Sequence, residues 1–213
     1  GEAFAGDIIV DAVRALRESY PEVRINLIEG YSEQLRYRLY DGEFDFIAAG
    51  VSAFELNNDF EREQIYSTDD IIVCRADHPL AGRKTLKLAD LSGYGWLVPY
   101  SRPADLNTIV DSFVAENLEP PTHIIGSDAY RLGMPLLAES DLLVMVSPAL
   151  IEPELSAPVP VLTKLNIRKP TIRRHASLIY PRTRPLTGPA ELLLKEVRKF
   201  AQLKTDTKKT SAA

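Results

Sequence analysis

The chain has 213 residues, of which 45% are hydrophobic, and a formal net charge of -5. This length allows a sizeable buried core, and the modest acidic balance excludes a bulk attraction to nucleic acid or another polyanion. The single cysteine, Cys74, excludes a disulfide within the chain and favours a reducing, cytoplasmic compartment. No apolar run approaches the ~20 residues that a membrane-spanning helix needs, so no membrane partner is predicted.

The first third of the chain predicts a helix, a strand, a second helix and a second strand. Apolar residues recur at helical spacing over residues 7–20, before a proline that stops the helix. Residues 23–28 alternate between apolar and polar side chains, as a half-buried strand does. Ser32 is a favourable N-cap for a helix that a glycine ends. With a buried strand at residues 44–49, this order predicts a parallel strand–helix–strand crossover.

The rest of the chain continues the alternation of strands and helices, with no internal repeat and no low-complexity linker. Strands are expected at 70–75, 95–100, 122–125, 142–146, 158–165 and 174–180, and helical segments at 86–93, 103–114, within 127–139 and from about 187. Pro135 predicts a late start or a kink in the helix within 127–139. The class is therefore α/β with mostly parallel sheets. Two such sheets would create a ligand cleft between them.

The sequence contains no recognisable catalytic or cofactor-binding motif. There is no nucleophile elbow, no glycine-rich phosphate loop with lysine, and no His-Glu-x-x-His pair. Cys74 and His78 lie four residues apart across a strand end, where a buried small hydrophobe is favoured over a catalytic thiol. No cluster has metal-ligand spacing. We therefore predict no enzymatic activity, no metal and no cofactor.

Hydroxyl side chains mark the starts of helices that follow strands. Ser32, Ser101 and Ser127 each stand at such a helix start. Free backbone N–H groups and a partial positive charge suit helix N-termini to a carboxylate or another small anion. The alternative is that each serine only caps its own helix. Arg102 is either a bidentate partner for a carboxylate or an ordinary surface arginine.

Five segments together resemble one known family. Residues 16–35 run from a helix ending in Tyr-Pro-x-Val through a strand into Glu-Gly and a second helix, and residues 39–47 carry Gly-Glu-x-Asp into a strand. Residues 75–81 contain a His-Pro-Leu turn, 88–91 a short helix, and 139–146 a late strand. This set resembles the effector-binding domain of LysR-type transcriptional regulators over nearly the whole chain.

The resemblance implies a type 2 periplasmic-binding-protein-like fold, with two Rossmann-like subdomains joined by two crossovers around a cleft. Subdomain I would hold 1–68 and 173–204, subdomain II 69–172, and 205–213 would form a disordered tail. Such domains bind a small effector and modulate an N-terminal winged helix-turn-helix, which is not among these residues. The implied partners are a small-molecule effector, a second copy in a homodimer or homotetramer, and DNA only through that other domain.

The resemblance also implies a set of effector contacts. Carried over by position, they are Glu2, Ala3, Phe4, Tyr31, Ser32, Gly50, Val51, Ser52, Ser101, Arg102, Ser127, Asp128, Val146 and Ser147. Asp128 would repel an anion unless it is protonated or paired. Val10 stands where many members have proline, and Ser140-Asp-Leu-Leu replaces the commoner Gly-x-Gly-Ile. The charge of the effector therefore stays open.

Two other classes of protein compete with a regulatory domain. An extracytoplasmic solute-binding protein of the same fold would carry a signal peptide or lipobox upstream, whereas a regulator would carry a winged helix-turn-helix. An enzyme built on this fold would need an acid–base pair in the cleft, and the sequence offers no convincing pair.

Overall fold

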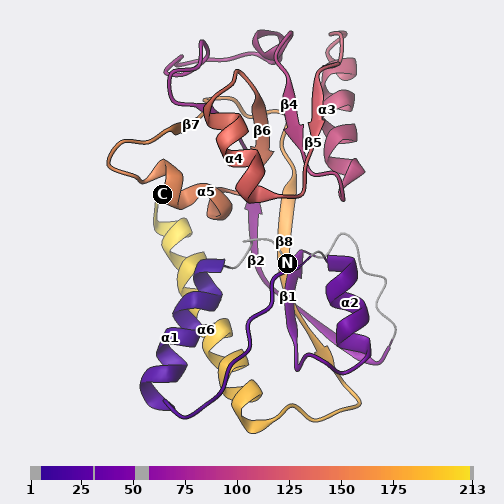
Figure 1. Ribbon diagram of the computed structural model, residues 1–213, viewed down its shortest axis with the longest axis vertical. Helices are drawn as coiled ribbons and strands as arrows, with labels where there is room; N and C mark the ends of the chain where they lie inside the picture. Colours follow the sequence, from indigo (N-terminus) through magenta and orange to yellow (C-terminus); the bar gives the residue numbers. More distant parts are fainter. Residues whose placement is uncertain (1–5, 31, 51–57, 212–213) are drawn as a thin grey trace. The chain divides into compact units, whose positions relative to one another are not determined.

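The computed structural model describes residues 6–30, 32–50 and 58–211 (Figure 1). The chain divides into two compact units, unit 1 with Gly1–Thr68 and Arg174–Ala213, and unit 2 with Asp69–Arg173. The chain therefore passes between the units within two long strands, β2 (Phe60–Asp69) and β8 (Arg173–Pro181). The division differs by one residue from the boundary expected between 172 and 173.

The helices and strands alternate along most of the chain. In chain order the other elements are α1 Gly6–Ser19, α2 Ser32–Tyr40, β1 Ile47–Gly50, β3 Ile71–Arg75, the short 3-10 helix η1 Leu88–Leu91, β4 Trp96–Val98, α3 Pro103–Ala115, β5 Ile124–Gly126, α4 Tyr130–Ala138, β6 Leu143–Val146, α5 Pro148–Leu155, β7 Leu162–Lys164 and α6 Gly188–Ser211. No helix in the described part of the chain is long and apolar enough to cross a membrane.

In unit 1, α1 lies beside α6 and the strands form the order β1-β8-β2 (Figure 1). Of the apolar residues whose spacing predicts this helix, Leu16 is buried, whereas Ile9 and Val13 are only partly buried. Ile8 and Ala12 complete the buried face of α1, in a core cluster with Val197 and Ala201 of α6. Residues four apart in α1 lie on one face of the helix, which is why the periodicity found this helix.

The strand predicted at residues 23–28 is absent from the structure, which assigns no strand between residues 21 and 30. Val23 and Ile25 are partly buried against the unit 1 core, but Leu27 is 59% exposed. The predicted parallel crossover is therefore also wrong, because β1 pairs antiparallel with β8. Alternation reports which side chains face a core; it does not report whether the backbone has a strand partner.

The second helix, α2, ends as the sequence predicts. Leu35 and Leu39 are buried on one face, and Gly42 adopts φ 77° beyond the last turn. The N–H of Gly42 donates to the Leu39 carbonyl and that of Glu43 to the Arg38 carbonyl, which satisfies carbonyls at the helix end. Arg184 also donates to the Gly42 carbonyl.

Replacing Gly42 by alanine is expected to lower the free energy of unfolding by about 1–2 kcal/mol, because an L side chain is strained at positive φ. The new Cβ would also lie 2.9 Å from Nη1 of Arg184. The matched control is Gly188→Ala, where an added Cβ meets no atom within 4 Å of the described residues. Urea denaturation should separate the two variants, and equal stability would contradict the expectation.

Unit 2 is built on a mixed sheet with the strand order β5-β4-β6-β3-β7. β4 runs parallel to β5 and β6, whereas β3 runs antiparallel to β6 and β7. The prediction of mostly parallel sheets is therefore wrong. Helical crossovers α3 and α4 make β4, β5 and β6 parallel, but the direction of β3 depends on where the chain enters the unit.

Side chains cover both faces of this sheet. On one face, Trp96 of β4 belongs to the same cluster as Ile109 and Phe113 of α3. On the other, Leu97 packs in a cluster with Leu137 of α4, and with residues of α5. Adjacent residues of β4 are thus buried on opposite faces of the sheet, as expected of a sheet that is covered on both faces.

Two further differences concern helices. No helix was predicted at α5. Pro148 lies in its first turn, where proline is accepted, Pro153 lies inside the helix, and Ile151 is fully buried. The disordered tail predicted at 205–213 also differs from the structure, in which α6 runs to Ser211. The Thr205 hydroxyl donates to the Ala201 carbonyl at 2.9 Å within that helix.

Candidate functional site

The carboxyl ends of three parallel strands meet at one edge of the unit 2 sheet. Val98 of β4 pairs with Gly126 of β5, and Ile71, at the start of antiparallel β3, pairs with Val146 of β6. The residues that follow these strands therefore lie at one edge of the sheet, which we call the strand-end edge. It carries six of the predicted contacts: Ser101, Arg102, Ser127, Asp128, Val146 and Ser147.

At this edge the structure joins Ser101 directly to Asp128. The backbone N–H of Ser101 donates to both carboxylate oxygens of Asp128, at 2.9 and 3.1 Å. The Ser101 hydroxyl donates to Oδ1 at 2.9 Å. Ser101 is exposed and Asp128 is half-buried. The carboxylate of Asp128 is thus paired with donors, which is the condition set above for its presence in a ligand site.

Arg102 lies at the N-terminus of α3 and pairs with a buried carboxylate. Its Nε is 3.2 Å from Oδ2 of Asp105, whose side chain is 5% exposed. Arg102 itself is the N-cap residue and Pro103 follows at the first helical position. The guanidinium of Arg102 is therefore paired with a carboxylate of the same chain, and this pairing offsets the free-energy cost of burying the charge of Asp105.

The serines at these helix starts do not cap their helices as predicted. The N-cap residues are Arg102 for α3 and Ala129 for α4, so Ser101 and Ser127 precede them. Ser127 Oγ instead accepts a hydrogen bond from the Ala129 N–H at 3.1 Å. The simple capping alternative is wrong for both residues.

Ser147 is the N-cap residue of α5, but its side chain makes no capping hydrogen bond. It is only 8% exposed, and its Oγ has no hydrogen-bond partner among the described residues. A buried hydroxyl without a partner costs free energy, and such a group in a native structure calls for an explanation. This is the feature of the strand-end edge that the sequence did not single out from its neighbours.

The other predicted contacts are not brought together by the described structure. Ala3, Phe4, Tyr31, Val51 and Ser52 lie outside the described residues, as does Glu2. Ser32 begins α2 and Gly50 ends β1, both in unit 1, but their side chains are not described. These assignments stay predictions.

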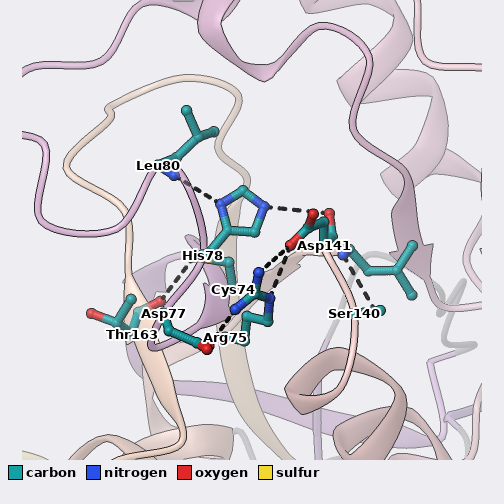
Figure 2. Close-up of polar contacts among 9 residues, drawn as sticks. Cys74, Arg75, Asp77, His78, Leu80, Ser140, Asp141 and Thr163 are labelled. Atoms are coloured by element: carbon teal, nitrogen blue, oxygen red, sulfur yellow. Dashed lines mark hydrogen bonds and ion pairs between the residues drawn. The ribbon is translucent and has the colours of Figure 1, made fainter.

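A second polar cluster lies at the opposite end of the same strands, after β3 and before β6 (Figure 2). Arg75 pairs with Asp77 and, at 2.7 Å, with Asp141. The hydrogen bonds that Arg75 donates to these two carboxylates raise the pKa of Arg75, and the bond accepted from Arg75 lowers the pKa of Asp77. The His-Pro-Leu turn and the segment before β6, which are far apart in sequence, are thereby joined.

Both ring nitrogens of His78 have polar neighbours in this cluster (Figure 2). The Leu80 N–H donates to Nδ1 at 3.0 Å, so the proton of the neutral ring belongs on Nε2, which faces the Asp141 carbonyl at 3.4 Å. The ring also contacts Tyr94, with centroids 4.6 Å apart. Burial lowers the pKa of His78.

Cys74 is a buried core residue beside this cluster. Its thiol lies 3.9 Å from the Thr163 carbonyl, and burial raises the pKa of Cys74 to about 12. A thiol that resists ionisation is a poor nucleophile. The arrangement agrees with the reading of Cys74 as a small hydrophobe. Among the described side chains, no group of three or more His, Cys, Asp or Glu is placed to hold a metal ion.

Comparison with known proteins identifies a family that matches this chain. Residues 1–202 match the model of the LysR substrate binding domain. The transcriptional regulator GbpR of Azospirillum brasilense is 24% identical over 204 residues, which cover 95% of this chain and 59% of that protein. The chain thus spans about three fifths of this relative. Because the curated relatives are regulators, the comparison favours a regulatory domain over a solute-binding protein.

Solved structures agree on the fold. The CcmR regulatory domain of Synechocystis PCC6803 in complex with 2-PG aligns with a TM-score of 0.74 at 18% identity, over 92% of each chain. The effector binding domain of QuiR in complex with shikimate aligns with a TM-score of 0.66 at 17% identity, over 91% of this chain and 90% of that one.

The architecture is therefore a type 2 periplasmic-binding-protein-like fold. The chain belongs to the LysR substrate-binding domain family.

Proposed function

We propose that this chain is the effector-sensing domain of a LysR-type transcription factor, and that the effector binds at the strand-end edge of unit 2. The effector would favour one conformation of the protein and so modulate DNA binding by a winged helix-turn-helix elsewhere in the whole regulator. The domain would bind its ligand without catalysing a reaction on it. The cleft between the subdomains, the homodimer or homotetramer and the cytoplasmic location remain predictions.

One observation carries this proposal, namely the Ser147 hydroxyl, which is buried and has no hydrogen-bond partner among the described residues. In open α/β sheets, ligands bind at the carboxyl ends of the strands. Ser147 lies at this edge and is the last residue before α5. A polar group of a bound ligand would supply the missing hydrogen bond. The CcmR and QuiR domains, which share the fold, were solved with 2-PG and shikimate.

Ser147→Ala is expected to weaken effector binding by about tenfold, the cost of one lost hydrogen bond. The melting temperature of the unliganded variant should stay equal or rise slightly, because the variant removes a buried hydroxyl that has no hydrogen-bond partner in the described part of the chain. A thermal-shift screen against carboxylates, sugars and amino acids identifies a ligand, and titration calorimetry then compares the two proteins.

The matched control is Ser177→Ala in unit 1. Ser177 Oγ is also buried without a hydrogen-bond partner among the described residues, but the residue is 0% exposed within β8. Its replacement should leave the dissociation constant unchanged. Unchanged affinity in Ser147→Ala would remove Ser147 from the site.

A further inference from the structure

We infer that the effector places a carboxylate at the start of α5, where it accepts hydrogen bonds from the Ser147 hydroxyl and the Ala149 N–H. The inference rests on the proposed function and names the chemical group that the site would bind. The sequence directs a small anion to the helix starts at Ser32, Ser101 and Ser127, whereas the contacts in the structure point to a different helix start.

The first turn of α5 contains a backbone donor without a partner. Pro148, at the first helical position, has no N–H, and the Leu150 N–H donates to the Ser147 carbonyl at 3.1 Å. Between them, the N–H of the half-buried Ala149 donates no hydrogen bond to any described residue. The first turn also has no acidic side chain to offset the partial positive charge of the helix N-terminus.

The Ser147 hydroxyl is a second, independent sign of a ligand at this helix start. Ser147 is 8% exposed, and its Oγ has no hydrogen-bond partner among the described residues. Its φ of -62° and ψ of 133° are those of an N-cap residue, whose side-chain oxygen normally accepts from an N–H two or three residues later. That bond is not formed here. Because Ser147 and Ala149 belong to one turn, their two donors are within reach of the two oxygens of one carboxylate.

The chemistry of these two groups favours a carboxylate over other polar groups. A backbone N–H only donates, so an ammonium group, which also only donates, cannot satisfy Ala149. A carboxylate has two acceptor oxygens, and its charge-assisted hydrogen bonds are about twice as strong as those of a neutral acceptor. The partial positive charge at the start of α5 adds to the attraction.

The neighbouring helix starts of unit 2 do not combine these features. The first turn of α3 also contains a donor, the Ala104 N–H, but Ser101 is exposed and donates its own N–H and hydroxyl to Asp128. The first turn of α4 contains the Arg131 N–H, but the Ser127 hydroxyl already accepts a hydrogen bond from a backbone N–H. The buried hydroxyl without a partner therefore assigns the anion to α5.

Charged side chains near this helix start act in opposite directions. Ile71 pairs with Val146, and continuing that register by one residue places Asp70 opposite Ser147. Asp70 is buried and has interaction partners within the chain, and its carboxyl opposes an anion when it is ionised. Arg131 is an exposed cation at the strand-end edge and attracts one. With these two opposed, the two donors of α5, which touch the ligand, decide the preference.

Titration calorimetry with matched probes tests the inference. Aromatic and aliphatic monocarboxylates are each compared with the corresponding primary amide, which keeps one acceptor oxygen and has no charge. The wild-type domain should bind at least one carboxylate about tenfold or more tightly than its amide. In Ser147→Ala this preference should shrink, because one of the two charge-assisted hydrogen bonds is lost.

Two variants of Ala149 test the position of the carboxylate. Ala149→Glu puts a negative charge in the first turn of α5, and Ala149→Gln adds a side chain of similar size without the charge. Carboxylate affinity should be about tenfold lower in Ala149→Glu than in Ala149→Gln. The melting temperature of Ala149→Glu should be equal or higher, because an acidic side chain stabilises a helix N-terminus.

The matched control is the same pair of substitutions at Ala104, the second residue of α3, where the difference in carboxylate affinity should be smaller. Carboxylates that bind no more tightly than their amides, equal affinities in the two Ala149 variants, or an equal or larger difference at Ala104 would overturn the inference. Hits confined to neutral compounds or amines that lose affinity in Ser147→Ala would also overturn it, and would leave the proposed function standing. A screen without any hit would contradict both.

Discussion

Replacing Phe113 by alanine is expected to lower the free energy of unfolding of unit 2 by about 3–5 kcal/mol, the usual cost of removing a buried aromatic ring. Phe113 is fully buried in the cluster that joins α3 to the sheet, together with Trp96 and Ile109. The loss combines the transfer of the ring to water with the cavity left behind.

The measurement is urea denaturation followed by tryptophan fluorescence, because the one tryptophan, Trp96, is buried in the same cluster. Val114→Ala is the control, since Val114 is the next residue of α3 and is 57% exposed. Its effect should stay within about 0.5 kcal/mol. A loss below ~1 kcal/mol for Phe113→Ala would mean that the packing of α3 described above is wrong.

Acid is expected to destabilise unit 2 through His78. Burial lowers the pKa of His78 in the folded chain, so the unfolded chain takes up the proton more readily. The stability contributed by the neutral ring is therefore fully present above the unfolded pKa of about 6.5 and is lost as the pH falls through the folded pKa. A proton on Nδ1 would also oppose the Leu80 N–H that now donates to it.

His78→Asn should remove this acid sensitivity, because the asparagine oxygen can still accept from Leu80 and does not titrate. His78→Leu should instead cost about 1–3 kcal/mol at every pH, since the buried Leu80 N–H loses its acceptor. The free energy of unfolding is measured between pH 7.5 and 5 for all three proteins. Parallel pH curves for wild type and His78→Asn would disprove the role of His78.

The surroundings of His78 define what else titrates nearby. Arg75, Asp77 and Asp141 form the ion-paired cluster beside the ring (Figure 2). The Tyr94 ring packs against the imidazole in a tilted arrangement. The pKa of Asp77 is lowered by its bond to Arg75, so its protonation adds to acid destabilisation only at lower pH. Both variants keep these groups, which is why the difference between the curves isolates the imidazole.

Local patterns in the sequence were enough to predict most helices. The stripe in α1, the paired leucines of α2 and the Pro103 start of α3 all follow from helical periodicity and terminal residues. The same rules failed at residues 23–28, where alternation without a strand partner gave no strand, and at α5, where no helix was predicted around the buried Ile151.

The candidate site was predicted only in part. Ser101, Ser127 and Ser147 could be placed after strands, but the sequence contains nothing that pairs Ser101 with Asp128, 27 residues later. It also gave no sign that Ser147, alone among these three serines, would keep a buried hydroxyl without a hydrogen-bond partner among the described residues. Such facts depend on the register of β4, β5 and β6, which places distant segments side by side.

By itself the sequence determined the α/β class, the family likeness and the positions of most elements, because periodicity and helix-terminal residues act over a few neighbouring residues. Only the tertiary structure decided the direction of β3, the internal partner of Arg102 and the carboxylate that already occupies the helix start at Ser101. Those features come from contacts between segments distant in the chain. The sequence suggested that the helix start at Ser101 binds an anion; in the structure the carboxylate of Asp128 already accepts hydrogen bonds from the N–H and hydroxyl of Ser101.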